Sequence, residues 1–379
     1  METTYVVHYA EIGLKGRNRA SFEKKLIKNI AQKNGILKSW RLPGRILLRA
    51  ESGLDLSTVF GIAWWAEVDR TATNVEEIGS KAIEVTRRLR DRPQSFAVRA
   101  KVADKRFELN SHELEIEIGQ RVQDATGLDV DLTHPHLTLF IEITHSGALV
   151  FTEKKRGPGG LPVGVSGKLM GLFSGGMDSA VACYLMAKRG CRIELVHFYA
   201  MSQAQEAHEA KIGKLARRLK EFNASIGIHY VPYHRFQIAS SGLPKMLRRH
   251  ELVVFRRFMA RTAELLAHKQ RARALFSGDN LGQVASQTLE NMIAVDHAIS
   301  MPMFRPVIGY DKIEITNQAK RIGVYGLSIG SYKDCCSLIS RHPATRANYD
   351  VIDAIETEIG VDKIIEETLR ESIFIESEG

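Results

Sequence analysis

A short turn rich in glycine and serine, with the sequence SGGMDS at 174–179, constrains the fold of this chain more than any other segment. It follows an apolar stretch at 169–173 and precedes a helical stretch at 180–189, and a second apolar run covers 193–199. Strand, turn, helix and strand in this order predict a βαβ unit, with the turn at the carboxyl end of the first strand. Open α/β sheets bind their ligands at that end.

The residue types in the turn suit a phosphate group. Gly175 and Gly176 let the backbone approach an anion closely, and the N–H groups at the helix start favour negative charge. Ser174 and Ser179 add hydroxyl donors. The carboxylate of Asp178 would repel a phosphate unless a cation lies between them, so we expect Mg²⁺ to bridge this residue and a nucleotide.

Other phosphate-binding motifs are absent from the sequence. The pair Gly167-Lys168 is followed by Leu169 and has Pro162 where the first glycine of G-x-x-x-x-G-K-[ST] belongs, and G-x-G-x-x-G does not occur. The remaining pattern, S-G-G-x-D-S, resembles the PP-loop of the ATP pyrophosphatases, which cleave ATP between its α and β phosphates. A serine- and glycine-rich turn without a ligand is the alternative.

Length and composition indicate a chain of two or three domains. The 379 residues exceed one typical domain, and a hydrophobic fraction of 44% supports substantial cores. No apolar run approaches the ~20 residues of a membrane span, and the start lacks a signal pattern, so we expect a cytoplasmic protein with no membrane partner. Four cysteines without a C-x-x-C pair do not predict a disulfide scaffold or a zinc or iron–sulfur site.

Charge is unevenly distributed along the chain, whose net charge is +9. Residues 1–50 hold 11 Lys and Arg against 3 Asp and Glu, whereas residues 351–379 hold 2 against 9. A basic body with an acidic end favours a polyanionic partner such as a nucleic acid, although a solvated surface with uneven charge gives the same pattern.

Two segments are the strongest candidates for contacting a phosphate backbone. The loop at 11–19 carries Lys15, Arg17 and Arg19 between glycines, as a backbone-binding loop would, or as an exposed basic turn would. Arg99 and Lys101 share one face of a strand expected at 95–102, because side chains alternate along a strand.

The order of elements predicts two small α+β domains followed by a doubly wound α/β domain with a parallel sheet. We expect domains at 1–56 and 57–156, a linker rich in glycine and proline at 157–167, and the nucleotide-binding domain at 168–379. Each domain combines strands and helices. Strands are expected at 5–9, 39–49 (a hairpin), 95–102, 138–144, 148–152, 169–173, 193–199, 226–231 and 272–277, and helices at 20–33, 74–90, 111–126, 180–189, 204–222, 251–267 and 313–322.

Nearly the whole chain resembles the tRNA 4-thiouridine synthetase family, the tRNA uridine sulfurtransferases that are also linked to thiamine thiazole synthesis. The resemblance rests on the order and spacing of several stretches. They are EIGLKG at 11–16, FTEKKRGPGGLPVG at 151–164, the PP-loop, HF at 197–198, FRRFM at 255–259 and GDNLGQVASQTLEN at 278–291.

The resemblance implies a ferredoxin-like domain, a THUMP domain that binds tRNA, and a PP-loop catalytic domain that uses ATP with Mg²⁺. Beyond the PP-loop, the nucleotide contacts of the family fall on Leu172, Phe173, His197, Phe198, Arg256, Gly278 and Gln287. Arg256 suits a phosphate, but a salt bridge within the core is the alternative for this residue.

The resemblance also implies a reaction. ATP adenylates the C4 oxygen of a tRNA uridine, expected at position 8, and sulfur then displaces AMP to give 4-thiouridine. The essential cysteine of the family aligns with Cys336, next to Cys335, and a low-pKa thiol would suit sulfur chemistry. Family members often add a rhodanese domain with a persulfide cysteine, and no cysteine follows Cys336, so we expect the form without it.

Several points stay open at this stage. The sulfur donor is a cysteine desulfurase, a separate sulfurtransferase or free sulfide, and a homodimer is left open. Two other functions fit the residues: a PP-loop adenylating enzyme acting on a different RNA base or substrate, and an RNA-binding protein without catalysis.

Overall fold

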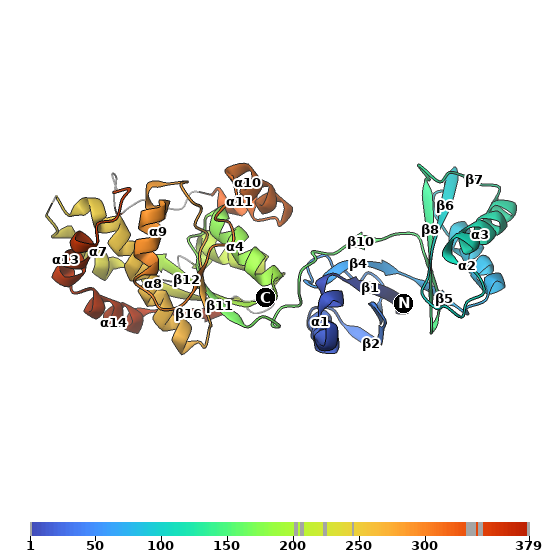
Figure 1. Ribbon diagram of the computed structural model, residues 1–379, viewed down its shortest axis with the longest axis horizontal. Coiled ribbons are helices and arrows are strands. Elements are labelled where there is room, and N and C mark those ends of the chain that lie inside the picture. Colours follow the sequence, from blue (N-terminus) through green and yellow to red (C-terminus); the bar gives the residue numbers. More distant parts are fainter. Residues whose placement is uncertain are drawn as a thin grey trace. The chain divides into compact units, whose positions relative to one another are not determined.

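The computed structural model describes residues 2–200, 204, 208–222, 226–244, 246–330, 339 and 344–376. The chain divides into two compact units, Met1–Gly160 and Leu161–Gly379 (Figure 1). Within the described residues, no helix is long and apolar enough to cross a membrane.

The first sheet of the N-terminal unit has the strand order β10-β4-β1-β3-β2. Its strands are β1 (Glu2–Tyr9), β2 (Ile36–Leu42), β3 (Arg45–Glu51), β4 (Ile62–Glu67) and β10 (Lys155–Arg156). The helix α1 (Arg19–Lys33) buries Leu26 and Ile30 against this sheet, and β2 and β3 form the hairpin that the sequence predicts.

The second sheet has the order β5-β9-β8-β6-β7, and α2 and α3 cover one of its faces (Figure 1). Its elements are β5 (Asp69–Thr71), α2 (Val75–Arg87), β6 (Ser95–Val102), α3 (Ser111–Thr126), β7 (Asp129–Val130), β8 (Leu137–Thr144) and β9 (Gly147–Phe151). Asn110 caps α3 in a capping box with Glu113, which fixes the start of this helix where the sequence predicts it.

The chain passes between the two sheets twice, which the sequence does not reveal. β4 pairs with β1 and the chain continues directly into β5 of the second sheet. The boundary expected after residue 56 therefore separates strands that belong to one sheet. After β9 the chain returns as β10 to pair with β4, and the N–H groups of Gly157 and Gly159 donate to the carbonyls of Ala63 and Ile62. The first residues of the expected linker are thus fixed to the first sheet.

Buried charges lie where the two sheets of this unit meet. Glu142 of β8 accepts hydrogen bonds from Arg45 of β3 and from His8 of β1, at 3.1 Å for the His8 contact. Burial raises the pKa of Glu142, but the hydrogen bond from His8 and the charges of His8, Arg45 and Lys101 outweigh it, so the pKa lies below its ordinary value. Trp64 stacks on His8 with ring centroids 3.9 Å apart. An ionised carboxylate therefore connects the sheets.

The C-terminal unit contains one sheet of six strands in the order β15-β14-β11-β12-β13-β16. These strands are β11 (Lys168–Leu172), β12 (Arg192–Tyr199), β13 (Gly227–Pro232), β14 (Leu275–Phe276), β15 (Met303–Phe304) and β16 (Ile373–Glu376). The first five are parallel, as the sequence predicts, and β16 adds an antiparallel edge next to β13.

Helices cover both faces of this sheet. One face carries α4 (Met177–Lys188), α6 (Gly213–Lys220), α10 (Lys312–Arg321) and α11 (Tyr325–Ser328). The other face carries α7 (His234–Ser241), α8 (Glu251–Lys269), α9 (Leu289–Asp296), α13 (Tyr349–Ile359) and α14 (Val361–Glu371). The core beneath α8 is continuous with the sheet through Phe255 and Phe258, both fully buried.

Two details differ from the sequence-based expectations. The helix expected at 204–222 contains a π-helical turn, His208–Ile212, before α6 begins. The acidic residues near the end of the chain are largely paired: Glu356 accepts from Arg257, Asp362 from Arg261, and Glu371 from Arg235. They therefore attach α13 and α14 to α7 and α8.

The buried carboxylate between the sheets gives a stability prediction. Replacing Glu142 by Ala leaves Arg45 as a buried uncompensated charge, which we expect to destabilise the N-terminal unit by ~3–5 kcal/mol. All 3 tryptophans of the chain (Trp40, Trp64, Trp65) lie in the first sheet, so tryptophan fluorescence during urea unfolding reports on this unit.

The matched control is Glu117→Ala, which removes an exposed pair with Arg121 and should cost less than ~1 kcal/mol. Because the pKa of Glu142 is lowered on folding, its stabilisation is present above the ordinary glutamate pKa and is lost as the pH falls through the lowered value. Equal effects of the two variants at neutral pH would contradict the assignment.

Candidate active site

The PP-loop turn connects β11 to α4 at the carboxyl end of the parallel strands. Gly175 has a φ of 82°, and a Cβ atom there would lie 2.4 Å from the Cδ1 atom of Ile212, so only glycine fits. The N–H of Gly176 donates to the Ser174 hydroxyl at 3.2 Å, and the Ser179 hydroxyl donates to the carbonyl of Gly176 at 2.9 Å. The turn is therefore closed by its own serines, with the start of α4 facing the strand ends.

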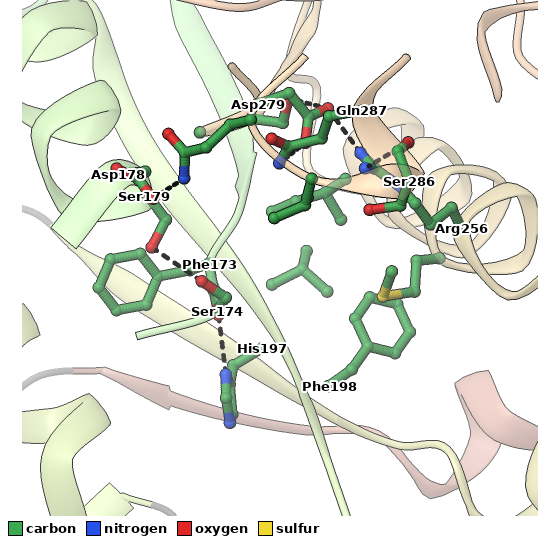
Figure 2. A pocket seen from close by; sticks show the side chains of 17 residues that line it. Phe173, Ser174, Asp178, Ser179, His197, Phe198, Arg256, Asp279, Ser286 and Gln287 are labelled. Carbon is green, nitrogen blue, oxygen red and sulfur yellow. Dashed lines mark hydrogen bonds and ion pairs between the residues drawn. The ribbon is translucent and has the colours of Figure 1, made fainter. Parts of the chain in front are cut away.

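A cavity of about 230 Å³ opens at this position (Figure 2). Most of the residues that the sequence predicts for nucleotide binding line it together. The lining comprises Leu172, Phe173, Ser174, Asp178, Ser179, Val196, His197, Phe198, Arg256, Met259, Ser277, Gly278, Asp279, Gln283, Val284, Ser286 and Gln287. Gly175 and Gly176 shape the turn beside the cavity without lining it.

One end of the cavity is apolar and suits a flat ring. Leu172, Val196, Phe198 and Met259 line it at the ends of β11 and β12 and on α8. Burial lowers the pKa of His197 to about 4, so this ring is neutral at pH 7. Its Nδ1 atom lies 2.8 Å from the carbonyl of Phe173 and therefore carries the proton. His197 thus holds the backbone at the end of β11.

The polar wall of the cavity is organised by Asp279, which the sequence analysis missed. Its carboxylate accepts from Arg256 at 2.6 Å, from the Ser277 hydroxyl at 2.8 Å and from the Gln287 amide at 3.3 Å. Figure 2 shows Arg256 directed toward Asp279 and Ser286. Burial raises the pKa of Asp279, but the charges of Arg256 and Arg305 and these hydrogen bonds hold it below its ordinary value.

This arrangement bears on the two interpretations of Arg256. The guanidinium forms a buried ion pair with Asp279, which is the core salt bridge that the sequence left as an alternative. The same side chain also lines the cavity, so the pair holds it at the cavity wall.

Asp178 lies at the cavity mouth next to a lysine from a distant part of the chain. The Nζ atom of Lys312, the first residue of α10, is 3.0 Å from both carboxylate oxygens of Asp178, and the Gln283 amide donates to Asp178 at 3.4 Å. Lys312 thus provides part of the positive charge that we expect beside Asp178. Lys312 lies 134 residues from Asp178, and its only local signal is the capping box of Asp311 and Glu314 that starts α10.

A metal ion at this site would depend on the nucleotide. Among the described residues, no group of three or more His, Cys, Asp or Glu side chains could hold a metal. Mg²⁺ commonly binds one or two carboxylates together with phosphates and water, and Asp178 fits such a position.

The predicted RNA-binding residues lie on the surface of the N-terminal unit. Arg17 is exposed on the 3₁₀ turn before α1, and Arg19 is exposed as the first residue of α1. Lys15 is half-buried, 5.5 Å from the centre of the Phe22 ring. Arg99 and Lys101 are exposed on the same face of β6. The structure thus leaves both candidate segments accessible to a large ligand.

The cysteines divide into two groups. Cys183 and Cys191 are buried, and burial raises the pKa of Cys183 to about 12, which excludes an activated thiol there. Cys335 and Cys336 lie outside the residues that the structure describes. The catalytic assignment of Cys336 therefore stays a prediction.

The parallel sheet, the SGGMDS turn and the cavity beside it define the C-terminal unit as a PP-loop nucleotide-binding domain, preceded by two α+β domains. Residues 164–361 match the family described as thiamine biosynthesis protein (ThiI), residues 72–153 match the THUMP domain, and residues 4–65 match the ThiI ferredoxin-like domain.

Whole-chain relatives agree with these matches. A probable tRNA sulfurtransferase of Thermus thermophilus is 36% identical over 98% of this chain and 93% of its own length. One of Brevibacillus brevis is 34% identical over 96% and 94%. The crystal structure of a 4-thiouridine synthetase–RNA complex with bound ATP matches with a TM-score of 0.89 and 33% identity over 100% of both chains. The chain belongs to the ThiI family.

The close approach of Gly278 to the PP-loop gives a prediction about nucleotide binding. A Cβ atom on Gly278 would lie 2.5 Å from the backbone nitrogen of Ser179 and 2.6 Å from the carbonyl carbon of Asp178. Gly278→Ala must therefore displace the start of α4. We expect ATP affinity to fall by ~10–100-fold, since losing a hydrogen bond from the displaced N–H groups to a charged phosphate costs ~1.5–3 kcal/mol.

Calorimetric titration with ATP measures this effect. The control is Gly309→Ala in the same unit, because nothing lies within 4 Å of a Cβ atom there. Unchanged ATP affinity of a folded Gly278→Ala protein would contradict the contact between β14 and the PP-loop.

Proposed function

We propose that this chain uses ATP to replace the C4 oxygen of a tRNA uridine by sulfur, which yields 4-thiouridine, at position 8 of the tRNA. The observation that supports this proposal most strongly is a single cavity with an apolar end, the PP-loop and the Asp178–Lys312 pair beside it. The whole-length similarity to a 4-thiouridine synthetase crystallised with RNA and ATP supports the same activity.

ATP would extend through the cavity, with its adenine ring at one end and its phosphates at the other. The adenine ring would occupy the apolar end between Leu172, Phe198 and Met259, since flat rings bind in such surroundings. The phosphates would lie at the PP-loop, where the N–H groups at the start of α4 offer an anion site. Mg²⁺ held by Asp178 and the phosphates would neutralise the charge of the leaving pyrophosphate.

The reaction then follows in two displacements. The uridine O4 atom attacks the α-phosphorus, an O–P bond forms, and the bond to pyrophosphate breaks. Sulfur attacks C4 of the adenylated base, the C4–O bond breaks, and AMP leaves with its oxygen. Lys312 and the start of α4 stabilise negative charge at the mouth during the first step.

The sulfur donor and a second product belong to the proposal as well. A cysteine desulfurase or a separate sulfurtransferase would transfer the outer sulfur of its own persulfide to the Cys336 thiolate, and the donor thiol would leave. Free sulfide, as the third possible donor, would attack C4 directly. The matching family description names thiamine biosynthesis, which favours sulfur transfer for the thiamine thiazole as a second function.

Nucleoside analysis tests the main proposal. Unmodified tRNA incubated with the protein, ATP, Mg²⁺ and sulfide should gain 4-thiouridine, with AMP and pyrophosphate released. Asp178→Ala should abolish ATP cleavage while tRNA affinity stays within a few-fold, because this carboxylate lies at the cavity mouth and the RNA candidates Lys15, Arg17, Arg19, Arg99 and Lys101 lie elsewhere.

Other outcomes select among the alternatives. ATP–pyrophosphate exchange without thiouridine would indicate a different substrate. RNA binding without ATP turnover would indicate a binding protein. Near-native AMP release by Asp178→Ala would remove the metal-binding role of this residue.

The two adjacent cysteines give a separate prediction. Cys336→Ser should retain ATP and tRNA binding and lose 4-thiouridine formation, because a thiolate is needed to handle sulfur. Cys335→Ser serves as the matched control and should keep part of the activity. Both variants are assayed with free sulfide and with a persulfide-donating protein. Full activity of Cys336→Ser with both donors would exclude the cysteine from the mechanism.

A further inference from the structure

We propose that a basic surface on the C-terminal unit binds the RNA backbone next to the reacting base. The surface consists of Lys214 and Arg217 on α6 with Lys320 and Arg321 at the end of α10, and is called the α6/α10 surface below. The inference depends on the proposed function in one respect, which is that the substrate is RNA. It adds a second RNA contact to the candidates on the N-terminal unit.

The amphipathic pattern of α6 places its cations outward. Leu215, Ala216 and Leu219 are buried against the neighbouring helices, whereas Lys214 and Arg217 are exposed. These two residues are three positions apart and therefore lie on the same face of the helix.

Arg218 joins the ends of α6 and α10. Its Nε atom donates to the carbonyl of Ile322 at 2.8 Å, and its guanidinium lies 5.4 Å from the centre of the Phe222 ring. A Cβ atom on Gly323 would lie 2.8 Å from the same Nε atom. The exposed cations Lys320 and Arg321 immediately precede this junction, and Lys214 and Arg217 lie within about one helical turn of Arg218, so both pairs flank the same junction.

Positive charge on this surface exceeds the negative charge around it. The segments 208–222 and 312–328 contain eight Lys and Arg residues and three glutamates. Glu221 already accepts from Arg218, Glu314 accepts from the backbone N–H of Asp311 in the capping box, and Glu209 also has an interaction within the chain. Within the described residues, no ion pair involves Lys214, Arg217, Lys320 or Arg321.

Helix dipoles explain only part of this charge. Cations in the last turn of a helix are favourable, which accounts for Arg217, Lys320 and Arg321. Lys214 directly follows the π-helical turn His208–Ile212 without a break in the helical backbone, so the dipole does not account for its charge. Because none of the four cations has an ion-pair partner among the described residues, an anionic partner outside the chain would bind this surface.

The position of the surface relative to the cavity favours RNA as this partner. α10 begins at Lys312, which contacts Asp178 at the mouth, and nine residues later reaches Arg321, a rise of ~13 Å. Enzymes that act on a base extrude it and hold the flanking nucleotides. The backbone next to a base in the mouth would therefore run along α10.

Four simultaneous substitutions to Gln test the surface: Lys214, Arg217, Lys320 and Arg321. We expect KM for an unmodified tRNA transcript to rise at least ~10-fold at 150 mM salt, and the log–log salt slope of RNA binding to fall by up to ~3. KM for ATP and kcat at saturating tRNA should stay within about two-fold, because none of the four residues lines the cavity.

The matched control replaces Arg192, Lys269, Arg271 and Arg273 by Gln. These four exposed cations lie near the amino ends of the strands, away from the cavity, and the change in net charge is the same. A further variant with Lys214→Arg and Lys320→Arg keeps the charge and should keep wild-type KM. Equal salt slopes and KM values for the test and control variants would overturn the inference.

The remaining outcomes separate this inference from the proposed function. If the wild type forms no 4-thiouridine, the proposed function fails, and the salt slopes of RNA binding still decide on the α6/α10 surface. If RNA binding is unchanged but activity falls only with a persulfide-donating protein and not with sulfide, the surface docks that protein and the RNA contact is refuted.

Discussion

The contact between Gly278 and the start of α4 is the constraint on which the active site depends. β14 lies beside β11, so Gly278, two residues after β14, meets the start of α4, which follows the turn after β11. With no side chain on Gly278, two backbones about 100 residues apart in sequence share one wall of the cavity. Asp279 follows directly and fixes Arg256 and Gln287 around the same point. The cavity is therefore a consequence of the strand order.

Sequence information was sufficient where the signal is local. The SGGMDS turn between a strand and a helix predicted the βαβ unit, because the glycines and the helix start act within a few residues. The same holds for α3, whose start is fixed by Asn110 and Glu113. The hairpin of β2 and β3 likewise follows from its own turn. The phosphate site expected at the SGGMDS turn stays a prediction.

The sequence was insufficient where partners meet through the fold. Lys312 reaches Asp178 only because α10 packs on α4, and Asp279 meets Arg256 only because α8 lies beneath β14. β4 and β10 were not predicted for a similar reason, since short strands carry little sequence pattern of their own and pair with strands distant in the chain. The expected boundary after residue 56 therefore separates β1 to β3 from β4 of the same sheet, and the expected linker begins directly after β10.

Charge has two different roles in this molecule, and burial decides between them. Glu142 and Asp279 are buried carboxylates whose positive partners are supplied from within the chain, so each fixes a junction between elements. Lys214, Arg217, Lys320 and Arg321 of the α6/α10 surface form no ion pair within the described residues. In water their mutual repulsion is weak and costs little stability. Their combined positive charge is nevertheless sufficient to favour the binding of a polyanion, whose bound counterions are released on contact. The buried, paired charges therefore stabilise the fold. The exposed, unpaired cations lie where the phosphates of a substrate can neutralise them.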